Sequence, residues 1–145
     1  AAMTSNDVTK LGTLDGKPVF RLTDTVYLSQ KDIRQVQLAK AAVRTGIESL
    51  LTAAGHTVAQ VDRVLIAGSF GFHLRTASLI NLGLLPREFA GRVEFVGNTS
   101  KTGAHAFLLN RHTRVKLHHT VGQVRVIELA NDASFQRTFV EALSF

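Results

Sequence analysis

Cysteine and tryptophan are both absent from this chain of 145 residues. Without a thiolate, the segment can hold neither a catalytic cysteine nor a cysteine-bound iron–sulfur cluster. The sequence also lacks an apolar run of about 18 residues, which a transmembrane helix needs, and its first residues do not have the pattern of a secretion signal. We therefore expect a protein of the cytoplasm that has no membrane partner.

Familiar catalytic and metal-binding motifs are missing as well. The six histidines have no recognisable zinc-ligand spacing. Ser69 does not lie in a Gly-x-Ser-x-Gly sequence, and no Walker phosphate-binding sequence occurs. The residues alone therefore indicate neither a bound metal nor a catalytic group.

Positive charge is in excess, with 17 Lys and Arg against 11 Asp and Glu and a net charge of +6. Most basic residues are scattered singly along the chain. The one cluster is "RHTRVKLHH", residues 111–119, and no aromatic residue interleaves it for base stacking. We favour a solvated helix face over the alternative, a patch for nucleic acid or an acidic protein.

The chain is long enough for one domain with a real core. Residues 1–7 are expected to be disordered or left over from cloning, and residues 8–145 to form a single domain. Apolar residues alternate around Asp15-Gly16, which predicts a β-hairpin, and residues 25–28 predict a further short strand.

A long helix is predicted next. Ser29 is placed to cap it, Asp32 completes a capping box, and Gly55 is placed to end it. The apolar residues at helical spacing are Ile33, Val36, Val43, Ile47, Leu50, Leu51 and Ala54.

Strands and helices alternate in the rest of the chain. The pattern predicts a buried strand at 64–68, a helix at 75–85, a strand at 92–98, helices from 99 to about 121, a strand at 123–129 and a closing helix with Phe135, Phe139 and Leu143 on its inward face. Such alternation indicates an α/β fold, a mixed sheet with helices on both faces, preceded by the hairpin.

Glycine marks the ends of two of these strands. The first turn consists of Gly68, Ser69, Phe70 and Gly71. Glycine lets the backbone approach a ligand or adopt a positive φ, and the N–H groups at a following helix start favour anions. A tight structural corner explains the same pattern.

The second turn has the same glycine-containing pattern and consists of Gly97, Asn98 and Gly103. Asn98 or Thr99 can cap the following helix, and Gly103 leaves room for a bulky neighbour. Close helix-to-strand packing is the structural alternative. If the two strands are parallel, both turns lie at one sheet edge, where ligands of open α/β sheets bind.

Lys40 falls within the apolar stripe of the long helix, with Gln37 and Arg44 beside it. A buried ammonium is costly unless it is paired. Lys40 must therefore either extend to the rim of the apolar surface or meet an anionic ligand.

Several strings together resemble one protein family. They are "LSQKDIRQVQLAKAAVRTGI", "VDRVLIAGSFGFHL", "LINLGLLP", "VEFVGNTSKTGA" and "IELANDASFQRTFVEALSF". The chain looks like the C-terminal part of the reductive activators of corrinoid proteins, which include the activating enzymes of O-demethylases. The resemblance extends from Val8 to Phe145, and its most specific element is Gln30 to Arg34.

The resemblance implies a ribonuclease-H-like, actin-like ATPase subdomain of the acetate kinase, sugar kinase, heat-shock chaperone and actin superfamily. Residues 67–71 match the adenosine motif, and residues 97–104 match the second connecting segment at the ATP cleft. Lys40 would lie on a helix that sends polar side chains toward the nucleoside. The nucleotide-binding residues so implied are Gly68, Ser69, Phe70, Gly71, Lys40, Gln37, Gly97, Asn98 and Gly103.

The resemblance to full-length members of the family implies a protein that transfers electrons from one domain to a corrinoid. A [2Fe–2S] domain, absent from this chain, would supply the electron, and ATP with Mg²⁺ would drive reduction of cob(II)alamin to cob(I)alamin on the corrinoid protein of a methyltransferase system. The upstream aspartate-glycine-threonine phosphate motif has no counterpart here, so the chain would join the remainder of a longer activator and would be inactive alone.

This chain departs from the family pattern in both turns. Ser69 stands where alanine is usual, Thr99-Ser100 replace paired alanines, and Lys101 follows them. One alternative is therefore a docking or dimerisation module, homodimeric or bound to the corrinoid partner, that works without nucleotide. A piece of a small-molecule kinase is a weaker alternative, because no candidate base lies beside the glycine turns.

Overall fold

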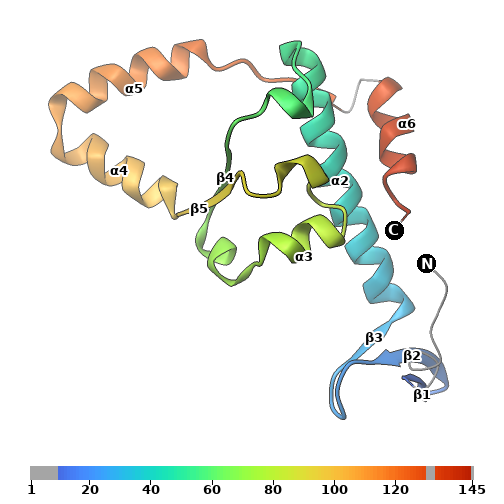
Figure 1. Cartoon of the computed structure of the whole chain (residues 1–145). Coiled ribbons are helices and arrows are strands. Elements are labelled where there is room, and N and C mark those ends of the chain that lie inside the picture. Colours follow the sequence, from blue (N-terminus) through green and yellow to red (C-terminus); the bar gives the residue numbers. More distant parts are fainter. Residues whose placement is uncertain (1–9, 130–132, 145) are drawn as a thin grey trace.

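The computed structural model describes residues 10–129 and 133–144. The expectation for residues 1–7 concerns a segment outside these ranges. No helix in the described ranges is both long and apolar enough to cross a membrane. Figure 1 shows a hairpin sheet at one end of a long helix, a body packed on that helix, and a two-helix arm that projects from the body.

The N-terminal sheet has three antiparallel strands. Strands β1 (Leu11–Leu14) and β2 (Lys17–Arg21) form the predicted hairpin, and β3 (Tyr27–Ser29) pairs with β2. The turn residues Asp15 and Gly16 have φ angles of 48° and 73°. Two positive φ angles in succession are what an Asp-Gly hairpin turn requires, so this prediction is confirmed.

Helix α2 (Gln30–Ala54) begins and ends where its capping residues predict. The Ser29 hydroxyl accepts a hydrogen bond from the Asp32 backbone N–H, and the Asp32 carboxylate accepts one from the Ser29 N–H at 2.8 Å. Gly55 ends the helix with a φ of 70°. The two bonds of the capping box satisfy backbone groups that the first helical turn leaves unpaired.

The body is built around two parallel strands, β4 (Val64–Ala67) and β5 (Val93–Gly97). Short helix α3 (Thr76–Asn81) and the segment after it supply the buried residues Leu79, Leu85 and Phe89. Partly buried apolar residues pack against this core: Ile47, Val58, Val61, Val64, Ile66, Leu74, Ile80, Leu84, Val93 and Phe95. The α/β class is therefore confirmed.

Strand β4 is less buried than its apolar sequence predicts. Ile66 faces the core, but Leu65 is 55% exposed and Val96 on β5 is 39% exposed. A parallel strand that is apolar on both faces normally has other elements packed against both faces. In the described residues only one face of the β4–β5 pair is covered by the core.

Helix α3 is shorter than predicted. The expected helix at 75–85 stops at Asn81, because Gly83 adopts a φ of 80° and the Leu84 N–H turns back to the Leu79 carbonyl at 2.9 Å. A left-handed glycine after the last turn is a common way to end a helix. Pro86 lies too far along the chain to be the stop.

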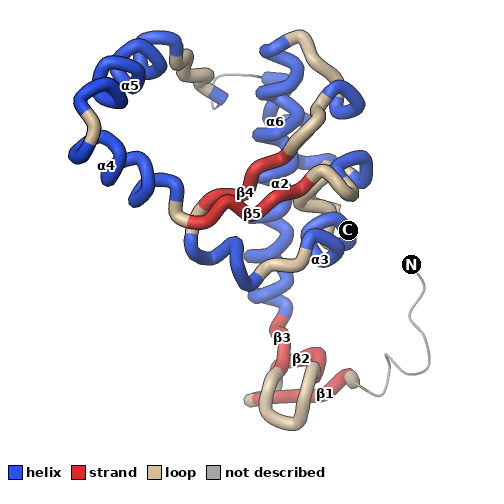
Figure 2. Tube along the Cα trace, turned by 60° about the vertical axis from the view of Figure 1, so that its left-hand side comes forward, coloured by secondary structure: helices blue, strands red, loops and turns tan. Residues whose placement is uncertain are grey.

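The arm consists of α4 (Thr99–Leu109) and α5 (Arg111–Gln123), with Asn110 between them as the cap of α5. Figures 1 and 2 show both helices extending away from the body. Arg114 on α5 joins them, since its side chain donates hydrogen bonds to the carbonyls of Phe107 at 2.7 Å and Leu108 at 3.0 Å. Arg114 therefore has a structural role in joining the two helices of the arm.

The strand predicted at 123–129 is wrong. Gln123 ends α5, and residues 124–128 form no strand in the described part of the chain. Val124 is extended, with φ −71° and ψ 128°, but it is 68% exposed and Val126 is 77% exposed. Alternating β-branched residues favour extended backbone, but a strand also needs a hydrogen-bonded neighbour. This segment runs from the arm back toward α2 and pairs with neither β4 nor β5.

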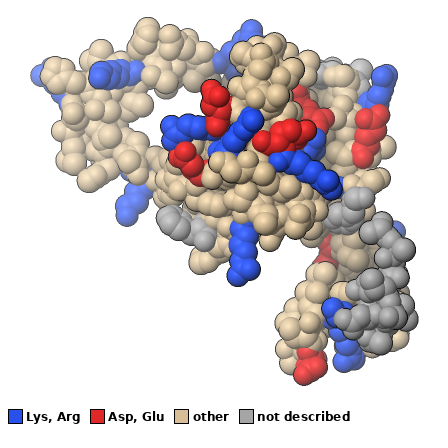
Figure 3. Space-filling model, in the orientation of Figure 1, with Lys and Arg blue, Asp and Glu red and all other residues tan. Residues whose placement is uncertain are grey.

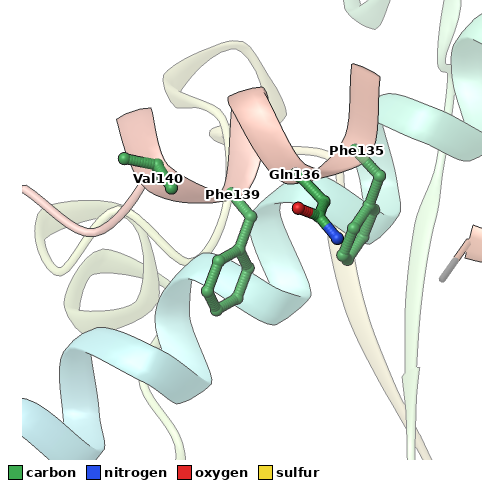
Figure 4. A pocket seen from close by; sticks show the side chains of 4 residues that line it. All are labelled: Phe135, Gln136, Phe139 and Val140. Atoms are coloured by element: carbon green, nitrogen blue, oxygen red, sulfur yellow. The ribbon is translucent and has the colours of Figure 1, made fainter. Parts of the chain in front are cut away.

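The closing helix α6 (Ala133–Glu141) lies alongside α2. Figure 4 shows Phe135 and Phe139 extending from α6 toward α2. Their rings stack with centroids 6.0 Å apart, and together with Gln136 and Val140 they line a cavity of about 280 Å³. Phe135 and Phe139 therefore lie on the inward face, whereas Leu143, which was also predicted on this face, lies beyond the end of the helix at Glu141.

Candidate functional site

The two glycine turns meet at the carboxyl end of the parallel strands. Ala67 pairs with Gly97 in the β4–β5 register, and the Gly68 N–H donates a hydrogen bond to the Gly97 carbonyl at 2.7 Å. The register shifts between Ile66 and Ala67, directly before this bond. The expectation that both turns share one edge of the sheet rested on parallel strands, and the strands are parallel.

Gly68 needs to be glycine for conformational reasons. Its φ of 103° and ψ of 154° lie where residues with a Cβ rarely fall, and no atom of the described residues lies within 4 Å of the position that a Cβ would occupy. The position is therefore strained for any other residue but open in space. An open backbone of this kind is available to a ligand.

Ser69 and Phe70 continue into a 3₁₀ helix, Ser69–His73, rather than directly into an α-helix. The side chain of Phe70 lies outside the described part. Gly71 has a packing role, because a Cβ there would lie 3.3 Å from both Ile66 Cγ2 and Phe95 Cδ1. The structural alternative therefore explains Gly71, which lets the turn fold back onto the two strands, but not the open space at Gly68.

The second turn leads straight into α4. Gly97 has a φ of 69°, and the side chain of Asn98 accepts a hydrogen bond from the Lys101 N–H at 3.0 Å. Asn98 is thus the cap that the sequence allowed. The positive end of the α4 dipole lies at this edge of the sheet, where it favours negative charge.

Gly103 lies in the second turn of α4, and within the described part of the chain no atom lies within 4 Å of the position that a Cβ would take there. Close helix-to-strand packing therefore does not account for this glycine. The surface beside Gly103 is open in the same way as the backbone at Gly68.

Lys40 lies in a different part of the molecule. It is 4% exposed, and its ammonium donates a hydrogen bond to the main-chain carbonyl of Ser144. Burial and the nearby charge of Arg44 lower its pKa. The cavity that Lys40 lines contains neither glycine turn, and Gln37, one helical turn before Lys40, is half-buried.

Charged residues at the opposite end of the strands are already paired. Arg63 and Glu94 form two hydrogen bonds of 3.0 and 2.7 Å, and each holds the other charged: the pKa of Glu94 is lowered and that of Arg63 is raised. Arg92 donates to the carbonyls of Val61 and Ala59. In Figure 3, acidic and basic side chains are interspersed over the body, so this face is not a uniform basic patch.

Sequence reasoning missed the surroundings of Lys40. Asn81, Gly83, Arg87 and Ser144 line the same cavity. The string "NLGLLPRE" contains a glycine and a proline close to the end of a helix, which was a signal for an irregular segment. Within the described ranges, no group of three or more histidine, aspartate or glutamate side chains could hold a metal ion.

Comparison with known proteins places this fold in a class. A family model described as "C-terminal domain of RACo the ASKHA domain" matches residues 5–145. The chain is therefore a domain of the actin-like ASKHA class. More particularly, it belongs to the family of C-terminal domains of RACo.

Two relatives support this assignment. The chain is 34% identical over 116 residues to the corrinoid activation enzyme RamQ of Eubacterium limosum, a match covering 79% of this chain and 19% of that protein. A solved structure of a reductive activator for a corrinoid, iron-sulfur protein matches with a TM-score of 0.82 and 27% identity, over 94% of this chain and 23% of that one. The chain thus spans about a fifth of the length of these relatives.

Proposed function

We propose that this domain is the nucleotide-binding part of an ATP-dependent reductive activator, which restores cob(I)alamin from cob(II)alamin on the corrinoid protein of a methyltransferase system. Its membership of the RACo C-terminal family supports the proposal, as do the names of both relatives. The activity would belong to the longer protein, in the cytoplasm.

The observation that carries the proposal is the hydrogen bond between the two turns, from the Gly68 N–H to the Gly97 carbonyl at 2.7 Å. This bond joins Gly68, an open glycine position, to the end of β5, which leads into α4 and its open position Gly103. The adenosine would lie along this edge. The contacting residues would be Gly68, Ser69, Phe70, Gly71, Gly97, Asn98 and Gly103. Gln37 and Lys40, which the family resemblance also implies, are left out of this set because the cavity that Lys40 lines contains neither glycine turn.

The residues fit a nucleoside better than they fit the other groups that the family uses. Neither residues 68–71 nor residues 97–103 include a carboxylate, so a Mg²⁺ ion would need ligands from elsewhere in the longer protein. The absence of cysteine excludes a thiolate-held [2Fe–2S] cluster from this chain. The electron would therefore come from a separate domain.

ATP supplies a hydrolysable phosphoanhydride when it binds. This domain would bind the nucleoside end and change its position relative to the rest of the activator as the nucleotide changes. A ligand shifts such an equilibrium only by its difference in affinity for the two states. The two glycine turns are the part of this chain that would respond to that difference in affinity.

Calorimetric titration of ATP tests the proposal. Gly68→Val puts a branched side chain at a left-handed position, and we expect it to weaken ATP binding by about tenfold or more. Because Gly68→Val also strains the turn, Gly103→Leu is the second variant: it fills open space on a helix without such strain. Gly46→Leu, at an equally open helical glycine of α2, is the control.

We expect Gly103→Leu to lose affinity and Gly46→Leu to keep it. Equal ATP affinity in the parent chain, Gly68→Val and Gly103→Leu would eliminate the adenosine assignment.

A docking module is the second candidate. The arm exposes large apolar side chains, with Leu108 at 67%, Leu109 at 73% and Val115 at 69% exposure. Surfaces of this kind mark interaction sites, and the partner would be the corrinoid protein, the remainder of the longer chain or a second copy. Calorimetry with the corrinoid protein distinguishes the two candidates, since a docking module predicts the same affinity with and without ATP.

A further inference from the structure

The positive charge of the chain is concentrated on the arm. Residues 99–123, which comprise α4, Asn110 and α5, contain four Lys and Arg and no Asp or Glu, so they carry +4 of the net charge of +6. The remainder of the chain has thirteen basic residues against eleven acidic ones. In Figure 3, basic side chains are visible on the arm and acidic ones are not. The arm is therefore a cationic projection from a nearly balanced body.

The junction of α4 and α5 is the part of the arm that lies furthest from the body (Figures 1 and 2). We call residues 107–116 the arm tip. Arg111 and Lys116 are exposed there, and neither forms an ion pair with another described residue. The guanidinium of Arg114 is already bound to the carbonyls of Phe107 and Leu108. Arg111 and Lys116 are thus the cations of the tip that can pair with a carboxylate of another molecule.

Large apolar side chains accompany these cations. Leu108 and Leu109 at the end of α4 are 67% and 73% exposed, and Val115 of α5 is 69% exposed. Val115 lies one helical turn after Arg111 and next to Lys116. Because the side chain of Arg114 ties α5 to the end of α4, these residues belong to one surface. Exposed apolar groups with a polar rim are typical of interaction sites.

The tip fits a protein better than a nucleic acid. Interfaces with nucleic acid are more polar than those between proteins, and the leucines and valine of the tip offer nothing to a phosphate backbone. Binding of single strands also uses aromatic stacking, but Phe107 is the only Phe, Tyr or Trp in residues 99–123. Its ring contacts His118, with centroids 6.3 Å apart, and the Arg114 guanidinium lies 5.4 Å from its centroid.

A second copy of this chain is a poor partner for the same surface. Pairing two arm tips would bring like charges together, which opposes association. The remainder of the chain is itself slightly basic, so it does not offer the opposite charge either. The partner must bring negative charge as well as apolar surface.

We propose that the arm tip docks on an acidic surface of a separate protein. Leu108, Leu109 and Val115 form the apolar centre of the contact, and Arg111 and Lys116 pair with carboxylates at its rim. Rim charges set the rate and specificity of such an association, whereas a desolvated centre supplies most of the affinity. The inference rests on the docking candidate described above and gives the chemistry of its partner. No residue of the glycine turns belongs to the tip.

The probe for this proposal is an amphipathic helical peptide of leucine and glutamate. It is titrated into the whole 145-residue chain while backbone amide resonances are followed. A peptide with lysine in place of glutamate and an oligothymidylate are the comparison probes. The test variant carries Arg111→Glu and Lys116→Glu. The matched control carries Lys17→Glu and Arg137→Glu, which make the same change in net charge at exposed positions on β2 and α6.

We expect saturable shifts at residues 107–116 with the glutamate peptide, and an affinity that falls as salt is added. The Arg111→Glu, Lys116→Glu variant should bind about tenfold more weakly or worse, and the control variant should bind like the parent. Leu108→Gln, which leaves the charge unchanged, should also weaken binding by about tenfold, because a leucine is lost from the apolar centre. The lysine peptide should not bind.

An absence of saturable shifts at 107–116 with the glutamate peptide would overturn the proposal, as would equal affinity in the two double variants. Tighter binding of oligothymidylate than of the peptide would assign the tip to nucleic acid instead. Shifts at the tip that depend on protein concentration alone would assign it to a second copy. The same titration of the longer activator should still show binding, and its loss there would mean that the rest of that protein covers the tip.

Calorimetry with the corrinoid protein separates this inference from the docking candidate. If the corrinoid protein binds the parent and the Arg111→Glu, Lys116→Glu variant equally well, docking holds but the tip is not its surface. Shifts at residues 68–71 with ATP report the nucleotide assignment independently, so each assignment can fail without the others.

Discussion

The ammonium of Lys40 donates a hydrogen bond to the carbonyl of Ser144, which lies 104 residues further along the chain. The bond joins the middle of α2 to the segment that follows α6. It supplements the apolar contact between these helices, in which Phe135 and Phe139 face α2. Lys40 therefore has a structural role in the folded chain and also lines a polar cavity.

Lys40→Met should change how stability depends on pH. Because burial and Arg44 lower the Lys40 pKa, the folded chain releases this proton at a lower pH than the unfolded chain does. Between the lowered pKa and the ordinary lysine value of about 10.4, the unfolded chain binds more protons, so the parent gains stability relative to Lys40→Met as pH rises.

Urea unfolding of both proteins from neutral to alkaline pH measures this difference. Lys31→Met, at an exposed position on the same helix, is the control and should show no such trend. A difference that stays flat or falls toward alkaline pH would contradict the assignment of Lys40 as a buried charge.

Thr45→Val should stabilise the chain. Thr45 is fully buried, and no donor or acceptor among the described residues meets its hydroxyl oxygen. Valine has nearly the same shape without the buried hydroxyl, so we expect the free energy of unfolding to rise by about 1 kcal/mol. The control Thr52→Val changes an exposed threonine of the same helix. A loss of stability in Thr45→Val would mean that the hydroxyl has a partner, such as a water molecule.

Ser29→Ala should weaken the start of α2. The change removes both hydrogen bonds that the Ser29 side chain makes within the capping box, and losses of this kind cost about 1 kcal/mol. Chemical denaturation at neutral pH measures the cost. Thr25→Ala changes an exposed threonine that lies before the helix and serves as the control. An equal cost in the two variants would rule out the cap assignment.

The same cap predicts an acid-sensitive contribution from Asp32. The hydrogen bonds from the Ser29 side chain and backbone lower the Asp32 pKa. A carboxyl with a lowered pKa contributes stability above its unfolded pKa, and this contribution is lost as pH falls through the folded value. The parent should therefore lose more stability than Ser29→Ala on acidification. Parallel acid-denaturation curves would contradict this prediction.

Local signals predicted the parts of the fold that depend on neighbouring residues. The Asp15-Gly16 turn and the two caps of α2 follow from backbone conformation and nearby hydrogen bonds, and all three are confirmed. A capping box or a hairpin turn needs only three or four consecutive residues. Such features can therefore be predicted from sequence.

Features that depend on distant partners were harder to predict. Val36, Val43 and Leu50 belong to the apolar stripe of α2, yet they are 38%, 44% and 55% exposed, whereas Lys40 and Thr45 are buried. Periodicity shows which helix face is apolar, but the elements that cover a face decide which residues are buried. The predicted strand at 123–129 failed for the same reason, since it lacks a neighbouring strand.

The candidate site also contains some features that the sequence predicted and others that it could not predict. Strand order and glycine position predicted that the two turns would share an edge, because parallel strands place their carboxyl ends together. The bond from Lys40 to Ser144 could not be predicted, since it depends on how α6 packs against α2. The roles of these residues in binding nucleotide remain predictions.

Amide chemical-shift mapping with adenosine and ATP tests the central claim, that the paired glycine turns form the adenosine wall. We predict saturable shifts at residues 68–71 and 97–103 with both ligands, and none at residues 111–123 of the arm. Shifts absent from both turns at saturating ATP, or confined to the arm, would contradict the claim.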